Sequence, residues 1–313
     1  MEAKITFIIV TWNNQDVICD CLDSLYRHVN MKFNVMLVDN NSTDNTIEKV
    51  NAGNYMNCII IKNHSNMGFA KANNLALKYV KTKYICYLNP DTIFIEDIIP
   101  KMIDFLENNP CTGIVGCKLL NEDLTLQPST FNFSTPFNIF CEKFKISKVL
   151  PNIIKEYWFP YEAKSYKSKK VDWIIGAVMV LRCKDALEIK GFSEEYYMYT
   201  EDMDICMKMK RKLNKNTYYI ADKSLVHLGG ISEAQNTNYK KMELLLDNSI
   251  KFAEKFGNEN SKRQTITMLS FCYFSRWLLL KVLVKLKILS YSKYANFIIK
   301  METGWKYLKK YKE

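Results

Sequence analysis

Short apolar, β-branched runs alternate with helix-forming segments in the N-terminal part of the chain, and this alternation most restricts the fold. The strand-like runs are Lys4–Trp12, Phe33–Val38, Cys58–Lys62 and Tyr84–Leu88. The intervening segments with apolar residues at helical spacing are Asp16–His28, Asp44–Val50 and Phe69–Val80. Continuous apolar strands separated by helices predict an α/β fold with a parallel sheet covered on both faces.

Polar residues follow three of these strands. The clusters are Thr11 to Asn13, Asp39 to Ser42 and Asn89 to Asp91. Any one of them is explained by a turn, because Asn, Asp and Pro are turn residues. Three at successive strand ends favour a binding site, since ligands of such sheets bind beyond the carboxyl ends of the strands. No glycine-rich dinucleotide or P-loop motif is present, which counts against those two enzyme classes.

The middle of the chain is less regular. Residues 121–170 are expected to form loops with short elements. Order returns with a strand over Val171–Arg182, a segment over Tyr196–Lys212 in which Glu201, Asp202 and Asp204 open a helix, and a strand over Thr217–Val226. Gly176 would lie in the middle of the first strand, where a ligand or another backbone approaches closely. Acidic residues at the start of the helix, taken alone, are typical of helix capping.

The net charge of +11 is concentrated at the C-terminus. Residues 240–313 hold 16 of the 44 basic residues but only 6 of the 33 acidic ones. Lysines there are interleaved with Trp and Tyr, which suits the surface of an anionic membrane, and we expect membrane association through residues 262–313. A helical cap on the preceding domain and an oligomer contact are the alternatives. Nucleic acid is not expected, because no recognised binding motif accompanies the charge.

The cysteine pattern predicts a reducing compartment. Ten cysteines are scattered without a C-x-x-C pair, and most lie in apolar runs. The N-terminus does not have the flanks of a secretory signal. No run of 18 uncharged apolar residues occurs, so a standard spanning helix is not predicted.

Seven segments carry a family resemblance through their order and spacing. They are IIVTWNN, VDNNSTD, NHSNMGFAKANN, YLNPD, VDWIIGAVMVLR, GFSEEYYMYTEDMDIC and HLGGIS. The series resembles the inverting family 2 glycosyltransferases with a GT-A fold, most closely the rhamnosyltransferase-like branch, over about residues 4–232. The resemblance implies a Rossmann-like, mostly parallel sheet flanked by helices. It implies a catalytic domain over 1–236, with a nucleotide-binding half over about 1–120 and an acceptor half over about 121–236, and a basic helical extension over 237–313.

The resemblance also implies roles for individual residues. Asp202 would be the general base that takes the proton of the attacking hydroxyl. Asp91 and His227 would hold Mg²⁺ or Mn²⁺, which neutralises charge on the leaving diphosphate. The nucleotide would be bound by Thr11, Asn13, Asp39, Asn66, Gly68, Lys71 and Asn89. The acceptor side would be shaped by Trp173, Gly176, Ala177 and Glu201.

Three departures from the family pattern bear on the donor. Asn89 stands where the pattern has a first metal-binding carboxylate, and Lys71 replaces the more usual Arg, so bidentate phosphate geometry is lost while the charge is kept. Residues 191–197, GFSEEYY, also differ from the usual G-G-F-D-E-x-F-F. Substitutions of this kind retune the pocket.

The function implied is transfer of a sugar from a nucleotide-sugar donor, dTDP-rhamnose or a UDP-hexose, to a hydroxyl of a glycan or lipid-linked acceptor. The reaction would be a direct displacement in cell-surface polysaccharide synthesis, by a cytoplasmic protein peripheral to the inner face of the cell membrane. Self-association into a homo-oligomer is left open. The alternative is a non-catalytic module that binds a sugar nucleotide or glycan with the same fold.

Overall fold

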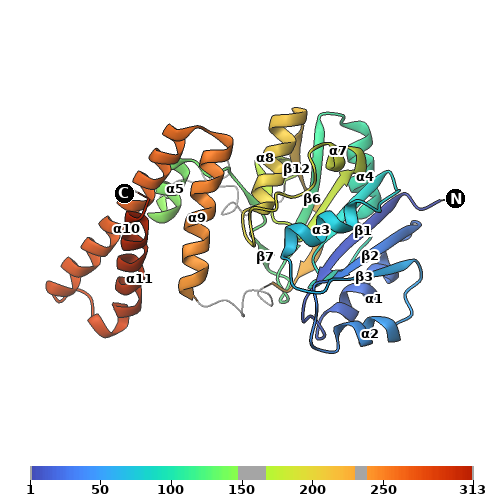
Figure 1. Cartoon of the computed structure of the whole chain (residues 1–313), viewed down its shortest axis with the longest axis horizontal. Coiled ribbons are helices and arrows are strands. Elements are labelled where there is room, and N and C mark those ends of the chain that lie inside the picture. Colours follow the sequence, from blue (N-terminus) through green and yellow to red (C-terminus); the bar gives the residue numbers. More distant parts are fainter. Residues whose placement is uncertain (1, 147–166, 230–237, 312–313) are drawn as a thin grey trace. The chain divides into compact units, whose positions relative to one another are not determined.

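A computed structural model describes residues 2–146, 167–229 and 238–311 of the chain (Figure 1). The chain divides into two compact units: Met1–Asn132 with Glu156–Glu233, and Phe133–Lys155 with Ala234–Glu313. The elements of the first unit are β1 (Ile5–Thr11), α1 (Ile18–His28), β2 (Phe33–Asp39), α2 (Thr46–Ala52), β3 (Cys58–Lys62), α3 (Phe69–Leu77), β4 (Tyr84–Leu88), β5 (Thr92–Phe94), α4 (Ile99–Asn108), β6 (Thr112–Leu120), β7 (Leu126–Gln127), β8 (Thr130–Phe131), β9 (Lys169–Val171), β10 (Trp173–Ile174), β11 (Val178–Arg182), α7 (Cys183–Glu188), α8 (Glu201–Leu213) and β12 (Asn216–His227).

The large sheet of the first unit has the strand order β3-β2-β1-β4-β11-β6-β12-β5, with β7 paired to β6 and β9 paired to β12. Strands β3, β2, β1 and β4 are mutually parallel. Strand β11 runs antiparallel between β4 and β6, whereas β12 is parallel to β6. The four apolar runs predicted as strands are therefore confirmed as a parallel sheet. The strands that extend this sheet beyond β4, namely β11, β6, β12 and β5, come from later in the chain.

One face of this sheet is covered by α1, α2 and α4. Alternate side chains of β1, namely Ile5, Phe7 and Ile9, are fully buried against apolar residues of these helices. The apolar residues of α1 are spaced three and four positions apart, which puts their side chains on one face of the helix: Ile18, Cys21, Leu22 and Leu25. Burial of both faces explains why every residue of β1 is buried.

The opposite face is covered in part by α3. Its first residue, Phe69, packs edge-on against Phe192, with ring centroids 5.4 Å apart. Phe192 in turn lies 4.6 Å from the ring of Tyr87 on β4. The segment that precedes α8 is thereby held against the sheet near the carboxyl ends of its central strands.

The prediction of one continuous strand over Val171–Arg182 is wrong. The segment forms β9, β10 and β11, which pair with different partners: β12, β8 and the β4–β6 pair. Gly176 therefore lies in a turn between strands. The helix that Glu201, Asp202 and Asp204 were expected to open does begin at Glu201, directly after Tyr199 and Thr200, which have left-handed backbone with φ of 65° and 89°.

The second unit is helical. It contains α5 (Pro136–Lys143), α9 (Asn238–Phe256), α10 (Glu259–Lys285) and α11 (Tyr291–Lys309). Its core joins all four helices through Ile139, Met242, Leu246, Ile250, Ile266, Leu269, Tyr273, Met301 and Leu308. Helices α10 and α11 approach closely at Gly304, where an added Cβ would lie 2.4 Å from the Tyr273 ring. The helical C-terminal extension is as predicted, but α5, expected in the acceptor half, packs with it.

By length and composition, α10 could cross a membrane. Its fully buried residues lie between Thr265 and Tyr273, and the partly buried Trp277 and Leu280 pack against the same core of the second unit. All ten cysteines are free thiols.

Candidate functional site

The ends of β1 and β2 form one polar cluster. Thr11 pairs with Asp39 in the parallel register, so the two polar segments that follow lie side by side. Asn13 has a left-handed φ of 53°; its N–H donates to Ser42 Oγ at 3.0 Å, and its Oδ1 accepts from Thr43 N at 2.8 Å. Ser42 donates to Asp39 Oδ1 from its hydroxyl at 2.5 Å and from its backbone N at 3.2 Å.

The Asp39 carboxylate keeps acceptor capacity beyond these bonds, since a carboxylate has about four lone-pair positions. Thr11 is buried, as Asp39 is, and its hydroxyl donates to Asn14 Oδ1 at 3.0 Å. That bond braces the turn after β1. Within this cluster, therefore, Asp39 has a carboxylate available to a ligand, whereas Thr11 holds the turn.

The segment Asn66–Lys71 lies against the end of β2. Asn40, next to Asp39, donates from Nδ2 to the Gly68 carbonyl at 3.3 Å, and Asn66 Oδ1 accepts from Gly68 N at 3.0 Å. Gly68 has φ +85°, and a Cβ there would lie 3.2 Å from the Tyr197 backbone oxygen. Lys71, in the first turn of α3, is exposed. The hydrogen bonds thus place Asn66 and Gly68 beside the end of β2, and Lys71 follows in the first turn of α3.

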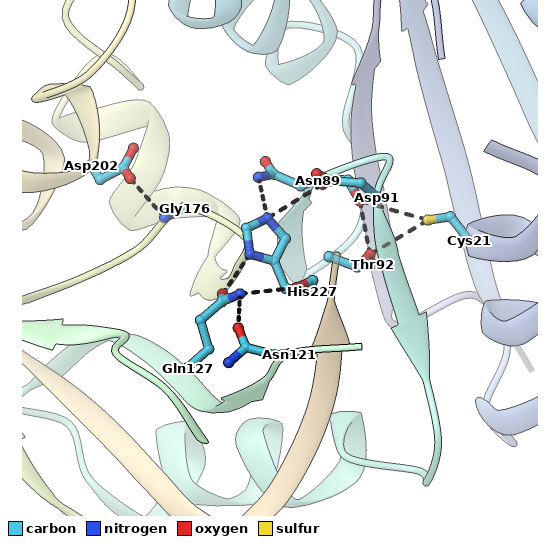
Figure 2. Close-up of polar contacts among 9 residues, drawn as sticks. All are labelled: Cys21, Asn89, Asp91, Thr92, Asn121, Gln127, Gly176, Asp202 and His227. Atoms are coloured by element: carbon cyan, nitrogen blue, oxygen red, sulfur yellow. Dashed lines mark hydrogen bonds and ion pairs between the residues drawn. The ribbon is translucent and has the colours of Figure 1, made fainter. Parts of the chain in front are cut away.

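A third group forms where β4 ends. Thr92 at the start of β5 pairs with His227 at the end of β12, and this antiparallel pair brings Asp91 beside the imidazole. His227 Nε2 lies 3.3 Å from Asp91 Oδ1 and 3.3 Å from Asn89 Nδ2. Both Asp91 and His227 are buried. Figure 2 shows these side chains converging from two segments that are distant in sequence, the turn between β4 and β5 and the end of β12.

The Asp91–His227 pair fits part of a divalent cation site. Among the described residues, no three His, Cys, Asp or Glu side chains group closely enough to hold a metal by themselves. Mg²⁺ and Mn²⁺, however, take few protein ligands when substrate phosphates and water supply the others. One buried carboxylate beside one imidazole nitrogen matches that mode of binding.

The remaining candidates gather at the start of α8. Gly176 N donates to Asp202 Oδ2 at 2.9 Å, and a Cβ on Gly176 would lie 2.9 Å from Asp202 Oδ1. Only glycine therefore allows this contact without displacement of the carboxylate. Burial raises the pKa of Asp202 from 3.8 to about 6, although the Gly176 N–H and the nearby His227 oppose the rise.

Glu201 differs from its neighbour. Burial, reinforced by the charge of Asp202, raises the pKa of Glu201 from 4.5 to about 8. Its Oε2 is buried and has no hydrogen-bond partner in the described part of the chain. Burial therefore favours the protonated form of both carboxyls, and the charge of Asp202 adds to this effect at Glu201, whereas the Gly176 N–H and His227 favour the ionised form of Asp202. One carboxyl can donate a hydrogen bond while the other can accept a proton.

Trp173 and Ala177, which are also predicted to shape the acceptor side, contact groups other than these two carboxyls. Trp173 stacks on Phe131, with centroids 4.5 Å apart, and its Nε1–H donates to Asn132 O at 2.9 Å. Ala177 is fully buried, and its carbonyl accepts from Asn89 N at 3.0 Å. Ala177 thus links the start of β11 to the end of β4 through the backbone.

One further residue of this site, Gln127, is not indicated by the sequence. Gln127 contacts His227 through both ends of its amide. It lies within residues 121–170, which the sequence indicates only as irregular. A glutamine on a two-residue strand matches no local pattern, so only the pairing of β6 with β7 reveals it.

The comparisons with known proteins agree with the motif series. The family model "Glycosyl transferase family 2" matches residues 6–160. Rhamnosyltransferase WbbL of Escherichia coli K12 is 30% identical over 149 residues, covering 45% of this chain and 54% of that protein. The N-acetylglucosaminyl-diphospho-decaprenol L-rhamnosyltransferase of Mycobacterium tuberculosis is 22% identical over 224 residues, covering 66% and 70%. The match to WbbL thus spans about half of that relative's length.

Among solved structures, the mannosyltransferase PcManGT of Pyrobaculum calidifontis, in complex with GDP-Man and Mn²⁺, aligns with a TM-score of 0.57. It is 14% identical, and the alignment covers 97% of this chain and 86% of that one. At this identity the likeness concerns the fold alone. It confirms the predicted mostly parallel GT-A sheet with flanking helices and a helical C-terminal region.

Proposed function

The chain carries a glycosyl transferase family 2 domain, and we propose that it moves a sugar, with inversion, from a nucleotide-sugar donor to a hydroxyl of a glycan or lipid-linked acceptor. The main support is the pair of adjacent carboxyls at the start of α8: Asp202 is held by the Gly176 N–H, and Glu201 has a buried Oε2 without a hydrogen-bond partner among the described residues. The names of the E. coli and M. tuberculosis relatives favour dTDP-rhamnose as donor, with UDP-hexoses as the second choice. Cell-surface polysaccharide synthesis is the setting that such acceptors imply.

Asp202 would act as the general base. Its carboxylate takes the proton of the acceptor hydroxyl while that oxygen attacks the anomeric carbon. The bond from the anomeric carbon to the diphosphate oxygen breaks on the opposite face, and the nucleoside diphosphate leaves with the electron pair. A base is most effective when its pKa lies near the working pH, and the burial of Asp202 moves its pKa in that direction.

Glu201 would orient the acceptor. As a protonated carboxyl it can donate a hydrogen bond to a sugar hydroxyl, and its unpartnered Oε2 can accept one. An unsatisfied buried polar atom is costly, so a partner from the substrate is the simplest compensation. Trp173 and Gly176 would contribute to the same side, Gly176 by fixing the Asp202 carboxylate through its N–H.

The donor would lie over the ends of β1, β2 and β4. The Asp39 carboxylate would accept from the base, with Thr11 and Asn13 shaping the pocket, while the exposed Lys71 would supply charge toward the phosphates. Gly68 lets the backbone approach closely, because it has no Cβ.

Asp91 and His227 would hold a divalent cation, Mg²⁺ or Mn²⁺, with Asn89 beside them. When bound, such an ion neutralises charge on the leaving diphosphate. The two residues themselves form a compact, buried donor pair that the β5–β12 pairing keeps in register with the strand ends.

The proposed function is tested by a thermal-shift screen of nucleotide sugars with Mg²⁺ and Mn²⁺, because a true donor stabilises the folded state by mass action. The stabilising donor is then assayed for metal-dependent hydrolysis and transfer. Hydrolysis that is lost in Asp202→Asn and Asp91→Ala supports the enzyme. A donor that binds but is never turned over, in wild type or variant, would instead support a non-catalytic binding module.

The second unit would attach the enzyme peripherally to an anionic lipid bilayer. A stripe of exposed apolar side chains runs along α10 and past its end: Phe271, Phe274, Leu278, Val282, Leu286 and Ile288. Residues 260–301 contain eight Lys or Arg and no Asp or Glu. Exposed apolar side chains among cations and no anions are complementary to the interface of an anionic membrane. The buried first half of α10 favours attachment over spanning, because that half already belongs to the core.

Sedimentation with vesicles tests this attachment. Wild-type protein should pellet with equal parts phosphatidylglycerol and phosphatidylcholine but not with phosphatidylcholine alone, and Leu278→Glu should lower the bound fraction several-fold. Ile59→Glu changes a similarly exposed apolar side chain of the first unit and serves as the control. If Leu278→Glu leaves lipid binding intact but converts a dimer to a monomer in light scattering, the surface is a contact between copies and the membrane proposal is wrong.

A further inference from the structure

The orientation of the Gln127 amide follows from its partners. Its nitrogen Nε2 lies 2.9 Å from the His227 carbonyl oxygen and 3.0 Å from Asn121 Oδ1. A carbonyl oxygen can only accept, so the atom facing it must be the donor NH₂ group. The other end of the amide, Oε1, is consequently the atom that lies 2.7 Å from His227 Nδ1. Figure 2 shows both ends of the Gln127 amide engaged with this one histidine.

The orientation of Asn121 is determined in the same way. Its Nδ2 donates to Thr125 Oγ1 at 2.9 Å, and the Thr125 hydroxyl donates to Asp123 Oδ1 at 2.5 Å. The Asp123 pKa is lowered by the hydrogen bonds from Thr125, so this carboxylate is ionised and can only accept. Every bond from Asp123 through Thr125 and Asn121 to Gln127 therefore has one allowed direction.

The consequence concerns the proton of His227. Gln127 Oε1 can only accept, so at 2.7 Å the ring nitrogen that faces it, Nδ1, carries the hydrogen. In the neutral ring the lone pair is then on Nε2. That nitrogen is the one that faces Asp91 Oδ1 at 3.3 Å. A neutral imidazole binds a metal through its unprotonated nitrogen, and the bond made by the other nitrogen decides which one that is.

We propose that Gln127 is a positioning residue, which holds His227 in the Nδ1–H tautomer and so directs the Nε2 lone pair toward a divalent cation at Asp91. This inference rests on the cation site of the proposed function. Gln127 also bonds the His227 backbone carbonyl, so one amide fixes both the ring and the main chain of the same residue. The sequence does not indicate this role, because the hydrogen-bonded residues Asn121, Asp123, Thr125 and Gln127 belong to the hairpin of β6 and β7, which matches no motif.

The tautomer can be observed directly in metal-free protein. The chain has three histidines, so His28→Gln combined with His64→Gln leaves His227 as the single imidazole signal. Long-range ¹H–¹⁵N spectra of ¹⁵N-histidine-labelled protein at pH 8 distinguish the two tautomers. We expect the Nδ1–H form in this background and a mixture of both forms after Gln127→Leu. Gln127→Glu keeps an acceptor opposite Nδ1 and should keep the Nδ1–H form.

Metal affinity provides the second readout. Mn²⁺ alone is titrated and followed by electron paramagnetic resonance, and Gln127→Leu should raise its dissociation constant by about 10- to 100-fold, with Gln127→Glu less affected. Gln264→Leu, the same change at an exposed position on α10, should leave it unchanged. An Nε2–H tautomer in the starting protein, or Mn²⁺ binding unaltered in Gln127→Leu, would overturn the proposal.

Neither readout needs donor or acceptor. An intact tautomer and metal effect in a protein without transferase activity would therefore count against the proposed function and leave the role of Gln127 standing.

Discussion

Replacement of Asp202 by Asn should separate catalysis from stability. The amide oxygen of Asn can still accept the Gly176 N–H bond, which is 2.9 Å long in the wild type, so the turn is preserved. The substituted side chain can no longer take a proton. A general base contributes about 10²- to 10⁴-fold to the rate, so kcat should fall by that factor while the donor dissociation constant stays nearly unchanged.

The wild-type pH profile follows from the same group. With a pKa of about 6 for Asp202, about nine-tenths of the molecules carry the active carboxylate at pH 7 and about one-tenth at pH 5. The wild-type kcat should therefore fall about tenfold for each pH unit below 6. The residual kcat of the Asp202→Asn protein should not show this fall below pH 6.

Stability should change in the opposite direction. An acid whose pKa is higher in the folded than in the unfolded chain binds its proton more tightly when folded, so its ionisation destabilises the fold. For Asp202 this destabilisation is absent below about pH 4 and complete above about pH 6. A rise from 3.8 to about 6 corresponds to at most about 3 kcal/mol before discount for the partial exposure of the side chain. Asp202→Asn should thus raise the melting temperature at pH 7.5.

The assay measures nucleoside diphosphate release at saturating donor and acceptor between pH 5 and 8, with donor binding by calorimetry and unfolding by circular dichroism. Asp172→Asn, at a carboxylate paired with Lys210, is the matched control and should keep its activity. An Asp202→Asn protein with more than a third of wild-type kcat, or a flat wild-type profile from pH 5 to 7, would refute the assignment of the base. Loss of both activity and stability would point to a structural role.

Three further predictions follow from local geometry. Gly176→Ala places a Cβ 2.9 Å from Asp202 Oδ1, so kcat should drop at least about tenfold without weaker donor binding; wild-type kinetics would contradict it. Gly68→Ala introduces a side chain at φ +85°, which costs about 1–2 kcal/mol, and calorimetry should detect weaker donor binding; an unchanged dissociation constant would count against the placement of that segment. Asp185 is buried and paired with Arg182 and Lys215; Asp185→Ala leaves both cations without their carboxylate, should cost about 3–5 kcal/mol, and should lower the melting temperature while low-temperature activity persists. A melting temperature within a degree of wild type would show that these ion pairs are dispensable.

The sequence predicted the sheet where strands are buried on both faces. Lys4–Trp12, Phe33–Val38 and Tyr84–Leu88 are continuous apolar runs, and such runs have few alternatives to a central parallel strand. The polar residues after them had to meet at one edge, as Thr11 and Asp39 do in register. The prediction failed for Val171–Arg182, because an apolar run does not show which neighbours its parts pair with, and three pairings divide it.

The candidate site, too, could be predicted from the sequence only in part. The residue types and their order were readable, including the carboxylates at Asp91 and Asp202. Their electrostatic states were not, because the rise in the pKa of Glu201 and Asp202 comes from burial by segments far along the chain. The contact between His227 and Asp91 likewise exists only because β12 pairs with β5.

Local composition and periodicity were enough to predict which strands are central, where polar groups leave the sheet and which residues can carry charge, since these properties do not depend on distant partners. Only across the fold are the other properties settled: which groups face the two nitrogens of His227, how deeply Glu201 and Asp202 are buried, and which residues of α10 enter the core of the second unit. Each of those depends on the partner that a group meets across the fold, and a linear pattern carries no information about a partner 100 residues away, such as Gln127 for His227.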